Sequence, residues 1–166
     1  MSKIWGYYGN RVDKTWFDSS NIKFAECIDN ENDLKTLKVV FNNGSQYQYD
    51  KVNVRDYLLF REDLSQGKAL NKYIKANGYE YKKIEDANLE NLNEELEFRQ
   101  KGGIFVNYEN GKLILTDSTD NEILNKEVKL DANAFNTVCD ALTAVGKDIY
   151  VVNGVESENN ENEKPF

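Results

Sequence analysis

The sequence has no histidine, and its two cysteines, Cys27 and Cys139, are 112 positions apart. It therefore lacks the usual ligands of a zinc site and the general base of a serine or cysteine hydrolase. It also contains no glycine-rich phosphate loop and no Gly-x-Ser-x-Gly motif. Adjacent carboxylates such as Glu94 and Glu95 would point about 100° apart on a helix, so they do not converge on one reacting atom. The sequence predicts no catalytic residues, no metal site and no cofactor, and we expect that the protein is not an enzyme.

Long apolar runs are also missing. No segment approaches the roughly 20 apolar residues that span a bilayer, and residues 1–8 contain no apolar secretory core. With 166 residues, 40% of them hydrophobic, the chain can form one ordinary domain or two small ones. These features predict a soluble protein with a cytoplasmic location.

Basic residues are scarce overall, because the formal net charge is −8, but the acidic residues are not evenly spread. Residues 1–89 carry 14 Lys and Arg against 13 Asp and Glu, whereas residues 90–155 carry 6 against 12. The front half can therefore present a basic, aromatic face to phosphate even though the whole chain is acidic.

Residues 156–166 carry four carboxylates, and the chain's one proline, Pro165, directly precedes Phe166. Such a segment has too little apolar surface to offset the entropy of ordering it, so it is predicted to be a disordered acidic tail. It resembles the tails of bacterial and phage single-stranded-DNA-binding proteins. That resemblance implies that Glu161, Glu163, Pro165 and Phe166 dock into basic pockets on replication proteins. A merely solubilising terminus is the alternative.

The front half alternates between strand and helix signals. An Asn43-Gly44 pair between two apolar runs is typical of a tight hairpin turn. Farther on, the apolar spacing changes to that of helices, with a break near residues 65–67. The predicted elements are a strand within residues 16–27, a hairpin of residues 36–41 and 46–50, and helices at 57–64 and 70–74.

Several short motifs follow one another through this region. They are Ser-Ser-Asn-Ile at 19–22, Leu-Lys-Val-Val-Phe at 37–41, Asn-Gly at 43–44, Tyr-Gln-Tyr at 47–49, Val52, Ser-Gln-Gly at 65–67, Asn-Lys-Tyr-Ile-Lys at 71–75, and Tyr79. In order and spacing they resemble the KTSC domain, a module found at the end of some lysyl-tRNA synthetases and as a stand-alone bacterial or phage protein. The resemblance covers residues 19–84 and implies the fold; nucleic-acid binding has been suggested for the family. Asn53 stands near the place where the family commonly has proline, which predicts a less rigid turn into the helix.

The sequence of the back half predicts a short helix followed by strands and a longer helix. Asp131 can cap that longer helix, and Gly146 can end it. The order of strands and helix is distantly similar to the positive-cofactor-four family of single-strand binders, a pattern that many small α+β domains share. The predicted elements are a linker helix within 85–98, a hairpin of 103–108 and 113–116 with its turn at 109–112, a strand within 122–130, a helix from 131 to 146, and an edge strand at 149–152.

The predicted fold class is therefore α+β, with two small units of antiparallel strands packed on helices. The predicted organisation is a KTSC-like domain with an aromatic leader at 1–84, a linker helix at 85–98, strands plus a helix at 99–155, and the acidic tail at 156–166.

Single strands are held by aromatic side chains on which bases stack and by Lys and Arg that follow the phosphates. The chain offers this mixture mainly in its front half. Tyr47 and Tyr49 share one face of a strand and could equally roof the core. The leader around Trp5 could be a sheet strand or an exposed stacking arm. At helical spacing of four and three, Lys68, Lys72 and Lys75 form one basic stripe, which could contact phosphate or could equally be a solvated helix face. The predicted nucleic-acid-binding residues are Trp5, Tyr7, Tyr8, Arg11, Tyr47, Tyr49, Arg55, Lys68, Lys72, Lys75, Tyr79, Arg99 and Lys101.

These features together predict a single-stranded nucleic-acid-binding protein of phage-type DNA replication, with a tail that recruits replication proteins. The phage attribution depends on the resemblances and on a composition rich in lysine and asparagine. The alternative is a phage protein directed at host proteins, or one that sequesters a small molecule, without nucleic-acid binding.

Overall fold

The computed structural model describes residues 3–30 and 34–155, and the predicted tail with Glu161, Glu163, Pro165 and Phe166 lies outside them. The chain divides into two compact units, residues 1–92 and 93–166. Helix α3 (Leu89–Gln100) gives its first four residues to the first unit and the remainder to the second. None of the helices in the described residues is both long and apolar enough to cross a membrane.

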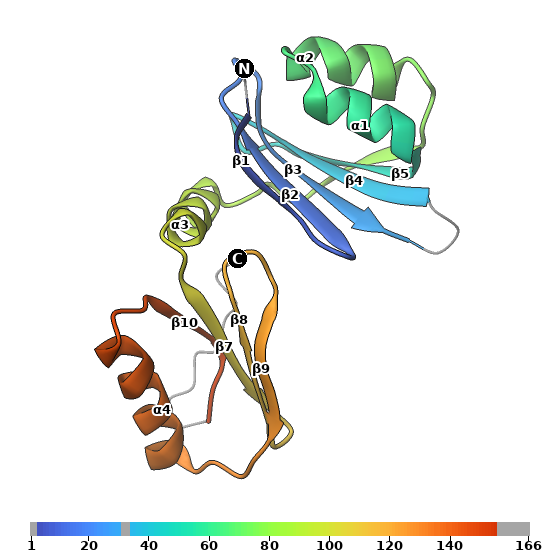
Figure 1. The fold of residues 1–166 in the computed structure, drawn as a ribbon. Coiled ribbons are helices and arrows are strands. Elements are labelled where there is room, and N and C mark those ends of the chain that lie inside the picture. The colour runs from blue at the N-terminus through green and yellow to red at the C-terminus, as the bar shows by residue number, and fades with distance from the viewer. Residues whose placement is uncertain (1–2, 31–33, 156–166) are drawn as a thin grey trace. The chain divides into compact units, whose positions relative to one another are not determined.

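The first unit is built on a six-stranded antiparallel sheet in which each strand pairs with its neighbours along the chain (Figure 1). The Asn43-Gly44 turn joins the fourth and fifth strands, and Gly44 has φ +93°, a conformation that glycine adopts without a steric penalty. The strands are β1 (Lys3–Tyr8), β2 (Val12–Phe17), β3 (Ile22–Asp29), β4 (Leu34–Phe41), β5 (Gln46–Asn53) and β6 (Tyr81–Ile84).

Three helical segments lie over one face of this sheet, which we call the helix face (Figure 1). They are α1 (Val54–Glu62), α2 (Gln66–Ala69) and the π-helical η2 (Leu70–Lys75). Asn53 caps α1, because its Oδ1 accepts a hydrogen bond from the Arg55 N–H at 2.7 Å. The core between sheet and helices contains Phe17, Ile22, Ala25, Cys27, Leu37, Val39, Tyr49, Val52, Tyr57, Phe60, Ala69, Leu70 and Ile74.

The opposite face of the same sheet carries a row of aromatic rings. Trp16 is 1% exposed, its ring centroid is 4.8 Å from that of Phe24 and 5.8 Å from that of Trp5. The Trp16 indole N–H donates to the backbone oxygen of Leu92 at 3.0 Å, which fixes the start of α3 on this face. Both faces of the first sheet therefore carry packed side chains.

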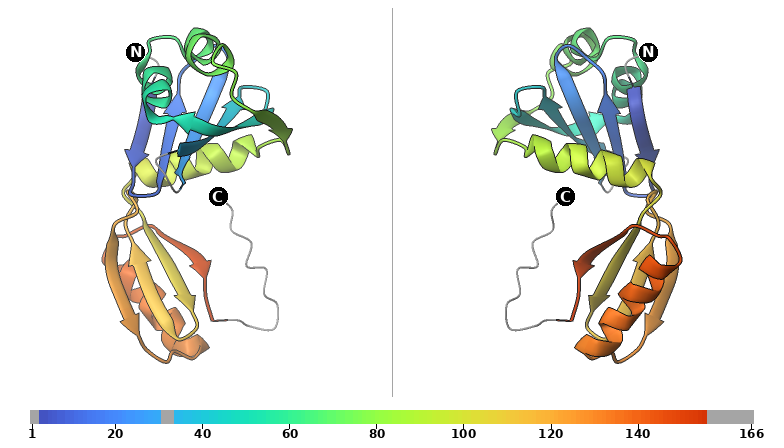
Figure 2. Two further views of the ribbon diagram at one scale, coloured as in Figure 1. Left: turned by 90° about the vertical axis from the view of Figure 1, so that its right-hand side faces the viewer. Right: turned by 90° about the vertical axis from the view of Figure 1, so that its left-hand side faces the viewer.

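The second unit is a four-stranded sheet with one helix along a face (Figure 2). Asp131 caps the helix as predicted, because its Oδ1 accepts from the Ala134 N–H at 2.8 Å. Val106 and Phe135 are buried where sheet and helix meet. The elements are β7 (Ile104–Glu109), β8 (Lys112–Thr116), β9 (Glu122–Glu127), α4 (Ala132–Ala144) and β10 (Ile149–Asn153), and the strand order is β10-β7-β8-β9.

The α+β class is confirmed, and three details of the predicted elements change. The single strand expected within residues 16–27 is two strands, because Ser19 Oγ accepts from the N–H groups of Asn21 and Ile22, both at 3.3 Å, and turns the chain. Strand β6 was not predicted. The edge strand β10 runs parallel to β7, whereas the other neighbouring strands in this sheet are antiparallel.

Candidate nucleic-acid interface

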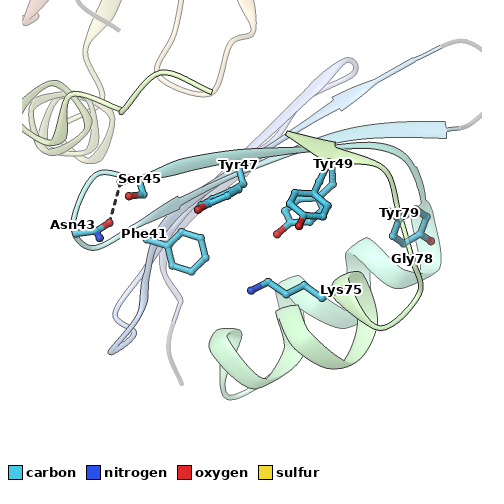
Figure 3. A pocket seen from close by; sticks show the side chains of 9 residues that line it. Phe41, Asn43, Ser45, Tyr47, Tyr49, Lys75, Gly78 and Tyr79 are labelled. Atoms are coloured by element: carbon cyan, nitrogen blue, oxygen red, sulfur yellow. Dashed lines mark hydrogen bonds between the residues drawn. The ribbon is translucent and has the colours of Figure 1, made fainter. Parts of the chain in front are cut away.

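A cleft opens in the first unit between strands β4, β5 and β6 and the chain around η2 (Figure 3). Its volume is about 680 Å³, within the range of small-ligand sites. We call it the aromatic cleft. Its lining residues are Phe41, Asn43, Ser45, Tyr47, Tyr49, Lys75, Gly78, Tyr79 and Tyr81.

The sheet supplies one wall of the aromatic cleft through the register of β5 and β6. Tyr49 pairs with Tyr81 across the two strands, so their side chains lie on the same face of the sheet. Tyr47 lies two residues from Tyr49 and shares that face. Tyr49 is only 2% exposed, whereas Tyr81 is 66% exposed. The wall therefore runs from a buried floor at Tyr49 to an open ring at Tyr81.

The rings of this wall contact one another. Ring centroids are 5.7 Å apart for Tyr49 and Tyr81, 6.5 Å for Tyr47 and Tyr81, and 5.7 Å for Phe41 and Tyr47. Burial, followed by the neighbouring tyrosines, raises the pKa of Tyr49 to about 12, so its hydroxyl stays neutral at physiological pH. The wall is a continuous, uncharged aromatic surface of the kind on which a nucleobase stacks.

Tyr79 stands at the other side of the aromatic cleft and is held by two hydrogen bonds. Its hydroxyl donates to Asp56 Oδ2 at 2.5 Å and accepts from the Asn53 N–H at 3.1 Å. Burial, together with the bond to Asp56, raises its pKa. The side chain of Asn77 also donates to Asp56, at 3.0 Å, and Gly78 continues the turn with φ +71°. The ring is thus fixed in position before any ligand binds.

Polar groups complete the lining. Lys75 extends from η2 into the space between helix and sheet (Figure 3), and its side chain is exposed. At the hairpin end, the Ser45 N–H donates to Asn43 Oδ1 at 3.0 Å. The aromatic cleft therefore combines stacking surface with a cation and a few hydrogen-bonding groups.

Four of the predicted binding residues are brought together here, namely Tyr47, Tyr49, Lys75 and Tyr79. Lys68 and Lys72 are exposed but do not line the cleft. Lys72 and Lys75 both lie in the π-helical η2, where a separation of three residues covers less of a turn than it does in an α-helix, so the two side chains diverge. Arg55 is also exposed outside it, in the first turn of α1.

The leader lies elsewhere. It forms strand β1, which leaves Trp5 half-buried and Tyr7 5% exposed, so neither is an exposed stacking arm. Tyr8 is 46% exposed, and the Arg61 guanidinium lies 4.0 Å from its ring centroid. Arg11 is exposed between β1 and β2. These four predicted residues do not join the aromatic cleft.

Arg99 and Lys101, the predicted residues of the second unit, are held by carboxylates. Arg99 is 5% exposed; its Nε donates to Glu95 at 2.6 Å and its Nη1 to the Ser118 carbonyl at 2.7 Å. Lys101 is exposed and pairs with Glu97 at 3.0 Å. Arg99 in this position stabilises the second unit and is too buried to contact a nucleic acid.

Phe41 and Tyr81 line the aromatic cleft but were not predicted. Their signal was present in the sequence. Phe41 ends the strand before the Asn43-Gly44 turn, and Tyr81 begins a short run, Tyr-Lys-Lys-Ile, after Gly78. Pairing that run with β5 would have placed Tyr81 beside Tyr49.

Residues 18–81 match the family model of the KTSC domain, which confirms the predicted resemblance. All nine residues that line the aromatic cleft fall within this match. No curated protein matches the chain. The cleft is thus contained in a recognised domain type, whereas the resemblances proposed for the second unit and for the tail stay predictions.

Proposed function

We propose that this chain is a single-stranded nucleic-acid-binding protein of phage-type DNA replication and that the aromatic cleft is where the strand binds. The observation that carries the proposal is the gathering of Tyr47, Tyr49, Lys75 and Tyr79 in one cavity, together with Tyr81. Two of these residues precede the helices and the others follow or end them, so only the fold unites them.

Stacking supplies most of the proposed affinity. A base on an aromatic side chain is worth about 1–3 kcal/mol, and every base has a π-face, so this term tolerates any sequence. Tyr81 is the ring best placed to provide it, because it is 66% exposed, whereas the other rings of the wall are half-buried or buried. Lys75 supplies charge for a phosphate beside the ring.

The acidic residues 156–166 belong to the same proposal as a segment that recruits replication proteins through Pro165 and Phe166. Their negative charge would also compete with the phosphates of the nucleic acid for basic side chains such as Lys75.

A second candidate is a protein that sequesters a small molecule or binds host proteins without nucleic acid. The observation in its favour is the cleft itself, because 680 Å³ is a normal size for a small-ligand site. The net charge of −8 also suits a partner other than nucleic acid.

The test is a fluorescence anisotropy titration of a short labelled single-stranded oligonucleotide at two salt concentrations. We expect binding that weakens with salt and varies little with sequence. Tyr81→Ala should lower the affinity about 5- to 150-fold, the equivalent of about 1–3 kcal/mol. The control is Tyr8→Ala, which removes the other exposed tyrosine ring, one that already faces Arg61.

Absence of binding at low salt would refute the proposal and favour the second candidate. Equal losses from Tyr81→Ala and Tyr8→Ala would contradict the location at the aromatic cleft. Thermal unfolding of both variants checks that each is folded.

A further inference from the structure

Lys83 lies on the same face of the sheet as the rings of the aromatic cleft. In the pairing of β5 with β6 it stands directly opposite Tyr47, two pairs along from Tyr49 and Tyr81 and on the same face. Opposed residues have Cβ atoms about 4.5–5.5 Å apart and share a face. The Lys83 side chain therefore starts beside Tyr47, next to the open ring of Tyr81, and it is exposed.

Lys82 lies on the other face. It pairs with Gln48, and successive residues of a strand point to opposite sides. Lys82 is also exposed, so the two lysines differ mainly in the face they occupy.

Lys75 lines the cleft from η2, and Lys83 lies on β6 opposite Tyr47, beside the lining. In the described part of the chain neither forms an ion pair with a carboxylate. The described lining of the cleft also contains no Asp or Glu. Two uncompensated ammonium groups beside an uncharged aromatic wall attract an anion that is attached to a flat ring.

The number of available rings limits how much of a strand can enter. Tyr49 is buried and Tyr79 is held by Asp56 and Asn53, so Tyr81 is the ring with an open face, and Tyr47 is half-buried beside it. The rings of Tyr47 and Tyr81 are tilted by 51°, so they do not form a stack of parallel platforms for successive bases.

Resting on the proposed function, we infer that the aromatic cleft holds one nucleotide at a time. Its base stacks on Tyr81 beside Tyr47, and its phosphate lies between Lys75 and Lys83. Lys83 is then a binding residue of the site, and Lys82 is not.

The experiment follows backbone amide shifts by NMR while the full chain is titrated with thymidine 5′-monophosphate or with thymidine. We expect the monophosphate to shift amides of β5, β6 and η2 and to bind about tenfold more tightly than the nucleoside, because a hydrogen bond to a charged group is worth about 1.5 kcal/mol or more. Lys83→Gln should remove most of that difference. Lys82→Gln removes the same charge from the opposite face and should retain it.

The two lysine variants are also compared with the labelled oligonucleotide. Lys83→Gln should reduce the slope of log K against log salt by about 0.7, the value of one phosphate contact on a single strand, and Lys82→Gln should leave it unchanged.

The outcomes separate the inference from the function on which it rests. Oligonucleotide binding without shifts from the monophosphate, or equal effects of Lys83→Gln and Lys82→Gln, would overturn the inference and leave the proposed function standing. Monophosphate binding that depends on Lys83, without detectable binding of the oligonucleotide, would support the one-nucleotide site and refute strand binding as the function. Neither ligand binding would overturn both.

Discussion

Replacing Arg99 by methionine should strongly lower the free energy of unfolding of the second unit. The guanidinium is 5% exposed, donates to Glu95 at 2.6 Å and to the Ser118 carbonyl at 2.7 Å, and lies 5.0 Å from the ring centroid of Phe105. Methionine fills part of the volume but leaves a buried carboxylate and a buried carbonyl without this donor. Breaking a buried ion pair in this way costs about 3–5 kcal/mol of the free energy of unfolding.

Lys101→Met is the matched control. Lys101 is two residues farther along the chain and makes the same kind of i,i+4 pair, with Glu97 at 3.0 Å, but both side chains are more than half exposed. Solvent screens an exposed helix pair and leaves it little net contribution to stability, so this variant should unfold almost as the parent does.

Urea denaturation followed by far-UV circular dichroism measures both changes. The two tryptophans, Trp5 and Trp16, lie in residues 1–92, so their fluorescence reports separately on the first unit. A loss below about 1 kcal/mol for Arg99→Met, similar to that for Lys101→Met, would refute the reasoning that burial makes this pair costly to break.

Two further predictions concern titratable groups of the first unit. Burial, followed by the charge of Asp13, raises the pKa of Cys27 to about 12, so in the native protein a thiol reagent should modify half-buried Cys139 first. The variant Cys139→Ser should then show only the slow reaction of Cys27, and fast modification of this variant would contradict the burial of Cys27. The hydrogen bond from Lys3, at 2.7 Å, lowers the pKa of Glu62, so this carboxylate stabilises the fold above its unfolded pKa of about 4.3 and ceases to do so as the pH falls through its lower folded value. Since Glu62 is about half exposed, Glu62→Gln should reduce the acid-side fall in Tm only slightly, and an unchanged pH profile would show that the pair contributes nothing.

Local chemistry made several elements predictable. The Asn43-Gly44 turn and the Asp131 cap depend on backbone geometry and on hydrogen bonds within a few residues, and the structure contains both. Strand β6 escaped prediction because its four residues, two of them lysines, have little strand character of their own. It becomes a strand by pairing with β5, more than thirty positions earlier in the chain. The parallel direction of β10 likewise depends on its partner β7.

The candidate site was predictable to a similar degree. Alternation placed Tyr47 and Tyr49 on one face, as the structure has them, but alternation does not say what covers that face. For that reason Tyr7, on a β-strand, and Arg99, on an α-helix, were both predicted to bind nucleic acid, although other parts of the fold bury them. The π-helical turns of η2 add a different limit, since a lysine spacing read as α-helical does not transfer to a wider helix.

The acidity of the chain and the composition of the aromatic cleft together restrict how a strand could bind. A protein that follows many phosphates needs a continuous basic groove, and affinity then falls steeply with salt. This chain has a net charge of −8, and the cation lining its cleft is Lys75, with Lys83 beside it. Even if each of these lysines neutralised one phosphate, the slope of log K against log salt would be only about −1.4. Stacking on Tyr81 must then supply the larger share of the affinity, so a shallow salt dependence combined with a strong effect of Tyr81→Ala is the signature that separates this mode of binding from a basic groove.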